Sequence, residues 1–151
     1  MAPLRSSVDI GRPPDEVFAY VTDPARFADW QSDVRSAHAL GEGPPTVGSR
    51  LTTVRKMGPR EGTMTQEITG IDPPRTWKVR GVDGPLRPSM SILVEPVNGD
   101  QHSRVTFSLD FEGHGVGALL VPIVRRMASK SAPVSYRRLK TILESGESRT
   151  G

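Results

Sequence analysis

The pattern of apolar and polar positions alternates with a period of two through the middle of the chain. This alternation predicts β-strands at residues 33–40, 49–57, 61–71, 75–82, 88–95 and 103–111. Turns rich in Gly and Pro separate the runs, and Asn98-Gly99 is a strong hairpin signal. Because each run is apolar on one side only, the pattern predicts an antiparallel sheet with one buried face.

The first 30 residues predict one strand followed by two short helices. Pro13-Pro14 suits a first helical turn, where a missing backbone N–H costs nothing, and acidic residues follow it at the positive end of the helix dipole. Asp23-Pro24 ends this helix and begins a second one, since the residue before a proline is driven out of the α region. The second helix ends at Trp30, which follows Phe27 by three positions, so both rings can face the same way.

From about Val116 to Glu144 the period lengthens to about 3.6, which predicts a helix of about 30 residues and about 45 Å. Its apolar arc is expected to face the sheet, and cations lie on the opposite side. The apolar arc holds Leu120, Ile123, Val124, Met127 and Val134; the polar side holds Arg126, Lys130, Arg137 and Lys140. Small residues (Ala128, Ser131 and Ser135) occupy the middle of the inward arc, so the helix either approaches the sheet closely or leaves space there.

Two prolines fall within this predicted helix. Pro133 sits on the polar side, where a proline kink bends a helix around the surface it packs on. Pro122 is either a proline of the first turn or a second kink.

The order of elements predicts an α+β fold in which a curved antiparallel sheet of about seven strands wraps around one long C-terminal helix. Two short helices follow the first strand. The chain is expected to form a single domain, residues 1–151, with its core at about 4–144 and a frayed tail from Ser145 to Gly151.

Composition and charge restrict the cellular location and the partners that we expect for the protein. The 151 residues include no cysteine, no apolar run near 20 residues and no signal-peptide pattern, so we expect a cytoplasmic protein without a membrane span. The net charge is +3, but basic and acidic residues are interspersed and no basic-aromatic cluster is present. We therefore expect no nucleic-acid partner. The oligomeric state stays open.

Four segments together resemble a known family. They are PPDEVFAYVTDPARFADW at 13–30, VGSRL at 47–51, GTMTQEITGIDPPRTWKVRG at 62–81 and SRVTFSLDFEG at 103–113. These segments are similar to the START-like superfamily, also called SRPBCC, and within it to the polyketide cyclase/dehydrase group. The resemblance covers residues 4 to about 144 and implies the helix-grip fold. It is specific for the fold and not for function, because members include lipid carriers, aromatase/cyclases and ligand receptors.

The resemblance also implies a deep apolar cavity between the sheet and the long helix, closed at one end by the two short helices. Trp30 is then expected to be mostly buried. From spacing alone the apolar residues would form an ordinary core, whereas the fold favours a cavity lined by Phe18, Trp30, Met57, Met64, Gln66, Trp77, Met90, Ile92, Phe107, Leu109, Val124, Met127 and Ser131. Arg55, Gln66, Ser131 or Ser135 would supply its polar anchors.

Candidate chemistry is sparse. No two of the three histidines have the spacing of a metal-binding pair, so neither a metal nor another cofactor is expected. Arg55 shares the apolar face of its strand, where an unpaired charge would need a ligand, an acid or water, unless that strand end is simply solvated. The candidates for catalysis are His114, Arg55 and Tyr136, although Tyr136 falls off the apolar arc of the helix.

These observations favour binding of a hydrophobic or aromatic small molecule, lipid- or polyketide-like, inside the cavity. The first alternative is a polyketide aromatase/cyclase or dehydratase, which could work mainly by holding a flexible substrate in a reactive conformation. The second is a protein-interaction module that uses the basic side of the long helix, although such a row of charges is usually a solvated face.

Overall fold

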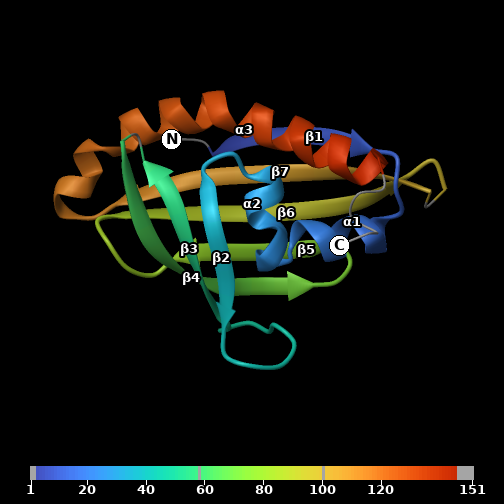
Figure 1. The fold of residues 1–151 in the computed structure, drawn as a ribbon, viewed down its shortest axis with the longest axis horizontal. Coiled ribbons are helices and arrows are strands. Elements are labelled where there is room, and N and C mark those ends of the chain that lie inside the picture. Colours follow the sequence, from blue (N-terminus) through green and yellow to red (C-terminus); the bar gives the residue numbers. More distant parts are fainter. Residues whose placement is uncertain (1–2, 58, 100, 146–151) are drawn as a thin grey trace.

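The computed structural model describes residues 3–57, 59–99 and 101–145, which form one sheet with helices on its concave side (Figure 1). The seven strands lie in the order β1-β7-β6-β5-β4-β3-β2, and every neighbouring pair is antiparallel. Their bounds are β1 Leu4–Ile10, β2 Val34–Leu40, β3 Arg50–Met57, β4 Arg60–Asp72, β5 Thr76–Gly81, β6 Leu86–Val97 and β7 His102–Gly113.

The helical segments occur where the sequence predicts them. They are α1 Pro14–Val21, the 3-10 turn η1 Pro24–Arg26, α2 Phe27–Trp30, the 3-10 turn η2 Gly115–Leu119 and α3 Val121–Ser145. Asp23 caps η1, because its Oδ1 accepts the Ala25 N–H at 3.0 Å. Pro122 lies in the first turn of α3, and Pro133 lies inside the helix on its exposed side. None of the described helices is long and apolar enough to cross a membrane.

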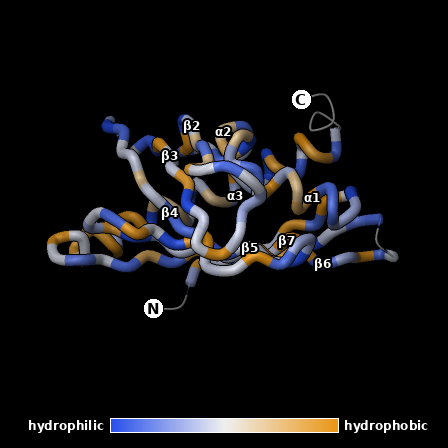
Figure 2. The backbone as a smooth tube through the Cα atoms, turned by 90° about the horizontal axis from the view of Figure 1, so that it is seen from below, coloured by the Kyte–Doolittle hydropathy of each residue, from blue (hydrophilic) through white to orange (hydrophobic). Residues whose placement is uncertain are grey.

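The fold is the predicted helix-grip arrangement. The sheet curls so that β2 and β3 rise beside α2 (Figure 2), while α1 packs on β6 and β7 and α3 packs on β1 and β7. Asn98 and Gly99 both adopt positive φ, as the hairpin signal between β6 and β7 requires. The apolar face of the sheet is thus covered from one side by all three helices, and the core lies between these layers.

Five aromatic rings connect the sheet to two of the helices, and we call them the aromatic chain: Trp77, Phe27, Trp30, Phe107 and Tyr136. Successive ring centroids are 5.9, 6.3, 5.8 and 3.9 Å apart. Trp77 lies on β5 and Phe107 on β7, on either side of Ile92 of β6 in the pairing register. The last contact, between Phe107 and Tyr136, is a stack with an interplanar angle of 8°. It fixes which side of α3 faces the sheet.

That side differs from the predicted one. The buried residues of α3 are Ser135, Tyr136, Leu139 and Leu143, whereas Leu120, Ile123, Met127 and Val134 are 40–58% exposed. The prediction that the apolar arc faces the sheet is therefore wrong, and so is the argument that Tyr136 lies off the inward face.

Polar contacts explain the rotation of α3. Arg125 Nη1 lies 2.8 Å from Asp110 Oδ1 on β7, and its side chain is only 13% exposed. Nearly three turns further along the helix, Ser135 Oγ accepts the Ser32 N–H at 3.0 Å. The buried side of the helix thus combines Arg125 and Ser135 with the larger side chains of Tyr136, Leu139 and Leu143.

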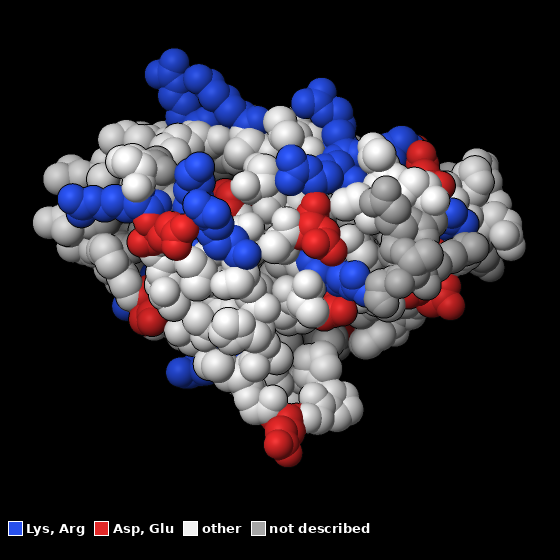
Figure 3. Space-filling view, viewed as in Figure 1, with Lys and Arg blue, Asp and Glu red and all other residues white. Residues whose placement is uncertain are grey.

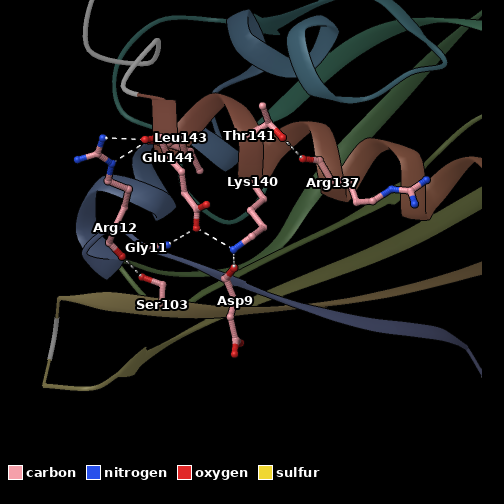
Figure 4. Close-up of polar contacts among 9 residues, drawn as sticks. All are labelled: Asp9, Gly11, Arg12, Ser103, Arg137, Lys140, Thr141, Leu143 and Glu144. Atoms are coloured by element: carbon pink, nitrogen blue, oxygen red, sulfur yellow. Dashed lines mark hydrogen bonds and ion pairs between the residues drawn. The ribbon is translucent and has the colours of Figure 1, made fainter.

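The last turn of α3 is fixed to the beginning of the chain (Figure 4). Lys140 Nζ donates to the Asp9 carbonyl at 2.5 Å and contacts Glu144 Oε2 at 2.7 Å. Glu144 Oε2 also accepts the Gly11 N–H at 2.8 Å, and Arg12 Nε donates to a carbonyl of the last turn at 2.8 Å. The hydrogen bond from Lys140 holds the pKa of Glu144 below its ordinary value.

Replacing Trp30 with alanine is expected to destabilise the protein strongly. The side chain is 0% exposed and joins Phe27 to Phe107, so its removal opens a cavity inside the aromatic chain. Loss of a buried tryptophan costs about 3–5 kcal/mol, out of a typical domain stability of about 5–15 kcal/mol. Thermal unfolding should show a clearly lower Tm for Trp30→Ala and little change for the exposed control His102→Ala. Equal melting temperatures would contradict the packing described.

Candidate binding site

Polar side chains enter the apolar interior from the neighbouring strands β3 and β4. Leu51, Thr53 and Arg55 alternate along one face of β3, opposite Gln66 and Met64 of β4. Thr53 is 0% exposed and Gln66 is 4% exposed, although both carry hydrogen-bonding groups. A ligand-binding site commonly combines an apolar wall with a few such polar groups.

Arg55 is held by two acceptors at the end of α2. Its Nη1 donates to Gln31 Oε1 at 3.3 Å and lies 3.1 Å from Asp33 Oδ2. The arginine side chain is only 19% exposed, so this end of β3 is not simply immersed in water. Of the alternatives that the sequence left open for this charge, Asp33 supplies the acid. The salt bridge leaves other N–H groups of the guanidinium for further contacts.

Three buried polar atoms have no hydrogen-bond partner among the described residues. They are Trp30 Nε1, Thr53 Oγ1 and Arg55 Nε, and we call these three atoms the unpaired trio. Thr53 and Arg55 lie two positions apart on one face of β3, and Arg55 contacts Gln31, which directly follows Trp30. Because most buried polar groups are paired in folded proteins, such a group calls for an explanation.

Helix α3 closes the same region from the opposite side. Ser135 contacts Ser32, one residue before Asp33, and Tyr136 stacks on Phe107. Burial and the nearby Asp33 carboxylate raise the pKa of Tyr136 to about 12. Its phenol is therefore protonated at neutral pH and able to donate a hydrogen bond.

The predicted cavity residues divide by their exposure. Phe18, Trp30, Gln66, Trp77, Ile92 and Phe107 are buried, and Met64, Met90, Leu109, Val124 and Ser131 are partly buried. Met127 is 49% exposed, so the described chain does not enclose it. The side chain of Met57 lies outside the described part of the structure.

Two of the three catalytic candidates are linked through Asp33. Arg55 pairs with Asp33, and the charge of Asp33 helps to raise the pKa of Tyr136, whereas His114 is exposed just before η2, where its Nε2 lies 3.2 Å from Glu112 Oε1. Within the described residues, no group of three or more His, Asp or Glu side chains is placed to hold a metal ion.

Sequence reasoning missed three members of the site: Gln31, Asp33 and Thr53. For Thr53 a signal existed, since it alternates in step with Leu51 and Arg55. Gln31 and Asp33 follow the second short helix and carry no periodic signal, so only the folded chain places them beside Arg55.

Comparison with known proteins supports the architecture. The family model described as "Polyketide cyclase / dehydrase and lipid transport" matches residues 1–144. No curated protein sequence matches the chain significantly.

Several solved structures share the fold at low sequence identity. Zhui aromatase/cyclase from Streptomyces sp. R1128 superposes with a TM-score of 0.76 at 14% identity, covering 97% of this chain and 93% of that one. A START superfamily protein from Mycobacterium smegmatis gives 0.76 at 13% identity, with 96% and 99% coverage. The di-domain aromatase/cyclase BexL of the BE-7585A biosynthetic pathway gives 0.76 at 16% identity and 97% coverage of this chain, which spans 48% of the BexL chain. At these identities the likeness shows the fold alone.

Changing Tyr136 to phenylalanine is expected to alter the pH dependence of stability. Between pH 10 and about 12 the tyrosine ionises in the unfolded chain but keeps its proton in the native state, so the native state loses relative stability as pH rises. The loss is about 1.4 kcal/mol for each pH unit in this window. Urea unfolding of both proteins at increasing alkaline pH should show a steeper decline for the wild type than for Tyr136→Phe. Parallel declines would contradict the burial of this phenol.

Proposed function

Because the chain belongs to the family described as polyketide cyclase/dehydrase and lipid transport, we propose that it binds a hydrophobic small molecule, lipid- or polyketide-like, between the sheet and α3. The observation that carries this proposal is the unpaired trio. One buried polar atom in each of Trp30, Thr53 and Arg55 has no hydrogen-bond partner in the described chain. A bound molecule would supply the missing hydrogen bonds.

The chemistry of these atoms indicates what the ligand must offer. The indole Nε1 and the guanidinium Nε are donors only, and a threonine hydroxyl donates or accepts. An unpaired buried donor costs about 1–3 kcal/mol, which a suitable ligand would recover on binding. The polar end of the ligand is therefore an acceptor, such as a carbonyl, phenolate or carboxylate oxygen.

The remaining walls suit an apolar body. Met64 of β4 and Met90 of β6 are partly buried on the inner face, and methionine side chains adapt to irregular partners. The aromatic chain borders them through Trp77 and Phe107, which offer flat rings for stacking. We also keep the cytoplasm as the proposed location, on the basis of the sequence.

Changing Thr53 to valine should weaken ligand binding selectively. Valine keeps the shape of threonine and removes only the hydroxyl, so an aromatic ketone or a fatty acid should lose about 1 kcal/mol of affinity, roughly fivefold. A hydrocarbon probe such as anthracene, which has no acceptor, should bind both proteins equally. Titrations followed by tryptophan fluorescence would measure these affinities, because Trp30 and Trp77 adjoin the proposed site.

Thr52→Val is the matched control for this experiment. Thr52 precedes Thr53 on β3 and faces the opposite side of the strand, so its substitution should leave every affinity unchanged. Absence of saturable binding across a broad panel of lipids and aromatic compounds would sink the proposal. Equal loss of affinity in both variants would show that the hydroxyl of Thr53 is not a contact.

The alternative is an aromatase/cyclase or dehydratase. It is favoured by the closeness of Arg55 and Tyr136 to the same carboxylate, Asp33, since a cation and a phenol could stabilise and protonate an enolate oxygen. Two of the similar structures are aromatase/cyclases. Folding a flexible substrate into one conformation would add to the rate.

Turnover of a poly-β-keto substrate distinguishes the two functions. If the protein is such an enzyme, Tyr136→Phe should lower kcat by roughly 100-fold, the scale of one lost general acid, and Arg55→Met should do the same. His114→Ala should have little effect, because His114 is exposed and contacts Glu112 instead. Product analysis by chromatography would measure the rates. Binding of the substrate without turnover would support the proposed ligand-binding function and contradict the enzymatic alternative.

A further inference from the structure

One end of the molecule exposes a cluster of large apolar side chains. They are Val116, Leu119, Leu120, Ile123 and Met127, on η2 and the first turns of α3, and we call them the apolar tip. Val116 and Leu119 are 74% and 78% exposed. In Figure 1 this segment forms the extreme end of the molecule, away from the last turn of α3. Contiguous exposed apolar side chains of this size mark an interaction site.

The apolar tip is held firmly against the sheet. The His114 N–H donates to the Pro85 carbonyl at 2.7 Å. Gly117 is buried, and a Cβ at that position would collide with the same carbonyl oxygen. The turn η2 is therefore packed on the loop between β5 and β6, and its outward side chains are presented to the surroundings by a fixed backbone.

Cations follow the apolar tip along the exposed side of α3. Arg126, Lys130 and Arg137 are exposed on one strip beside Ile123 and Met127, and none forms an ion pair with another described residue. The sequence contains no Asp or Glu from Gly113 to Leu143. The nearest carboxylates of β7 are already engaged, Asp110 with Arg125 and Glu112 with His114. Figure 3 shows Lys and Arg side chains projecting along the edge of the molecule formed by α3.

We propose that the apolar tip and this basic strip dock onto an anionic membrane surface. A helix with neighbouring apolar and Lys/Arg-rich strips lies at a lipid interface, with its apolar side chains among the acyl chains and its cations at the headgroups. A second copy of the chain fits this face poorly. Pairing two apolar tips would bring two sets of cations close together, and residues 113–143 offer no carboxylate to compensate their repulsion.

The test is co-sedimentation of the full chain with vesicles. The protein should bind vesicles of equal parts phosphatidylglycerol and phosphatidylcholine, bind pure phosphatidylcholine far less, and be released by added salt. Leu119→Ser combined with Ile123→Ser should reduce binding by roughly tenfold or more, since two apolar side chains no longer insert. Arg126→Gln combined with Lys130→Gln should also reduce it by roughly tenfold or more, at about fivefold for each cation.

Matched controls separate the proposed face from general surface effects. Val47 is 63% exposed in the loop between β2 and β3, and Arg80 is exposed on β5; Val47→Ser and Arg80→Gln should leave vesicle binding unchanged. Because all the substituted side chains are exposed, thermal unfolding should be similar throughout. Failure to bind anionic vesicles, or binding that is indifferent to the tip and strip substitutions, overturns the proposal. Concentration-dependent self-association that is lost in the Leu119/Ile123 variant, without vesicle binding, would assign the face to a dimer instead.

Discussion

The stack of Tyr136 on Phe107 determines how the rest of the molecule is arranged. An antiparallel sheet with one apolar face must be covered, and here the long helix α3 covers the side formed by β1 and β7. The stack sets the rotation of that helix, and through Trp30, Phe27 and Trp77 the same line of rings sets the positions of α2 and the middle strands. Once these rings are packed, the side chains of Gln31 and Asp33 contact Arg55 on the inner face of β3. The candidate site thus depends on aromatic packing more than on its own polar contacts.

Much of the fold is readable from the sequence, because strands and turns have local signals. Alternation of apolar and polar residues predicts the strands, and Asp23-Pro24 predicts the break between the two short helices. The spacing of Phe27 and Trp30 also predicts that both rings face the same way, and both are buried. The rotation of α3 is not readable in this way. The apolar arc of its first half is exposed, whereas the buried side carries Ser135, Tyr136, Leu139 and Leu143, and Arg125 pairs with Asp110. Periodicity identifies an apolar arc but does not say which surface covers it.

The site was predictable only in part for a related reason. The alternation of side chains along β3 predicts that Arg55 lies on the inner face. Its partners lie in a loop, whose position depends on packing between residues far apart in the sequence. The site combines a partly exposed ion pair with buried polar atoms that have no partner in the described chain, and these unpaired atoms cost stability in the empty protein. Natural proteins accept such costs at functional sites, where local rules of folding are broken for binding or catalysis. The family explains the scaffold, and these few polar atoms are where this chain could recognise a ligand.

The contacts that join the last turn of α3 to residues 9–12 have a consequence for how the protein folds during synthesis. Strand β1 pairs with residues 103–109 of β7, and the carbonyl of Asp9 and the N–H of Gly11 are held by Lys140 and Glu144. During synthesis the first strand leaves the ribosome long before either partner exists. Its pairing edge and the apolar face of the growing sheet therefore stay unprotected until the final helix emerges. Long-range closure of this kind slows folding in general, and exposed strand edges and apolar surface favour aggregation until it is complete.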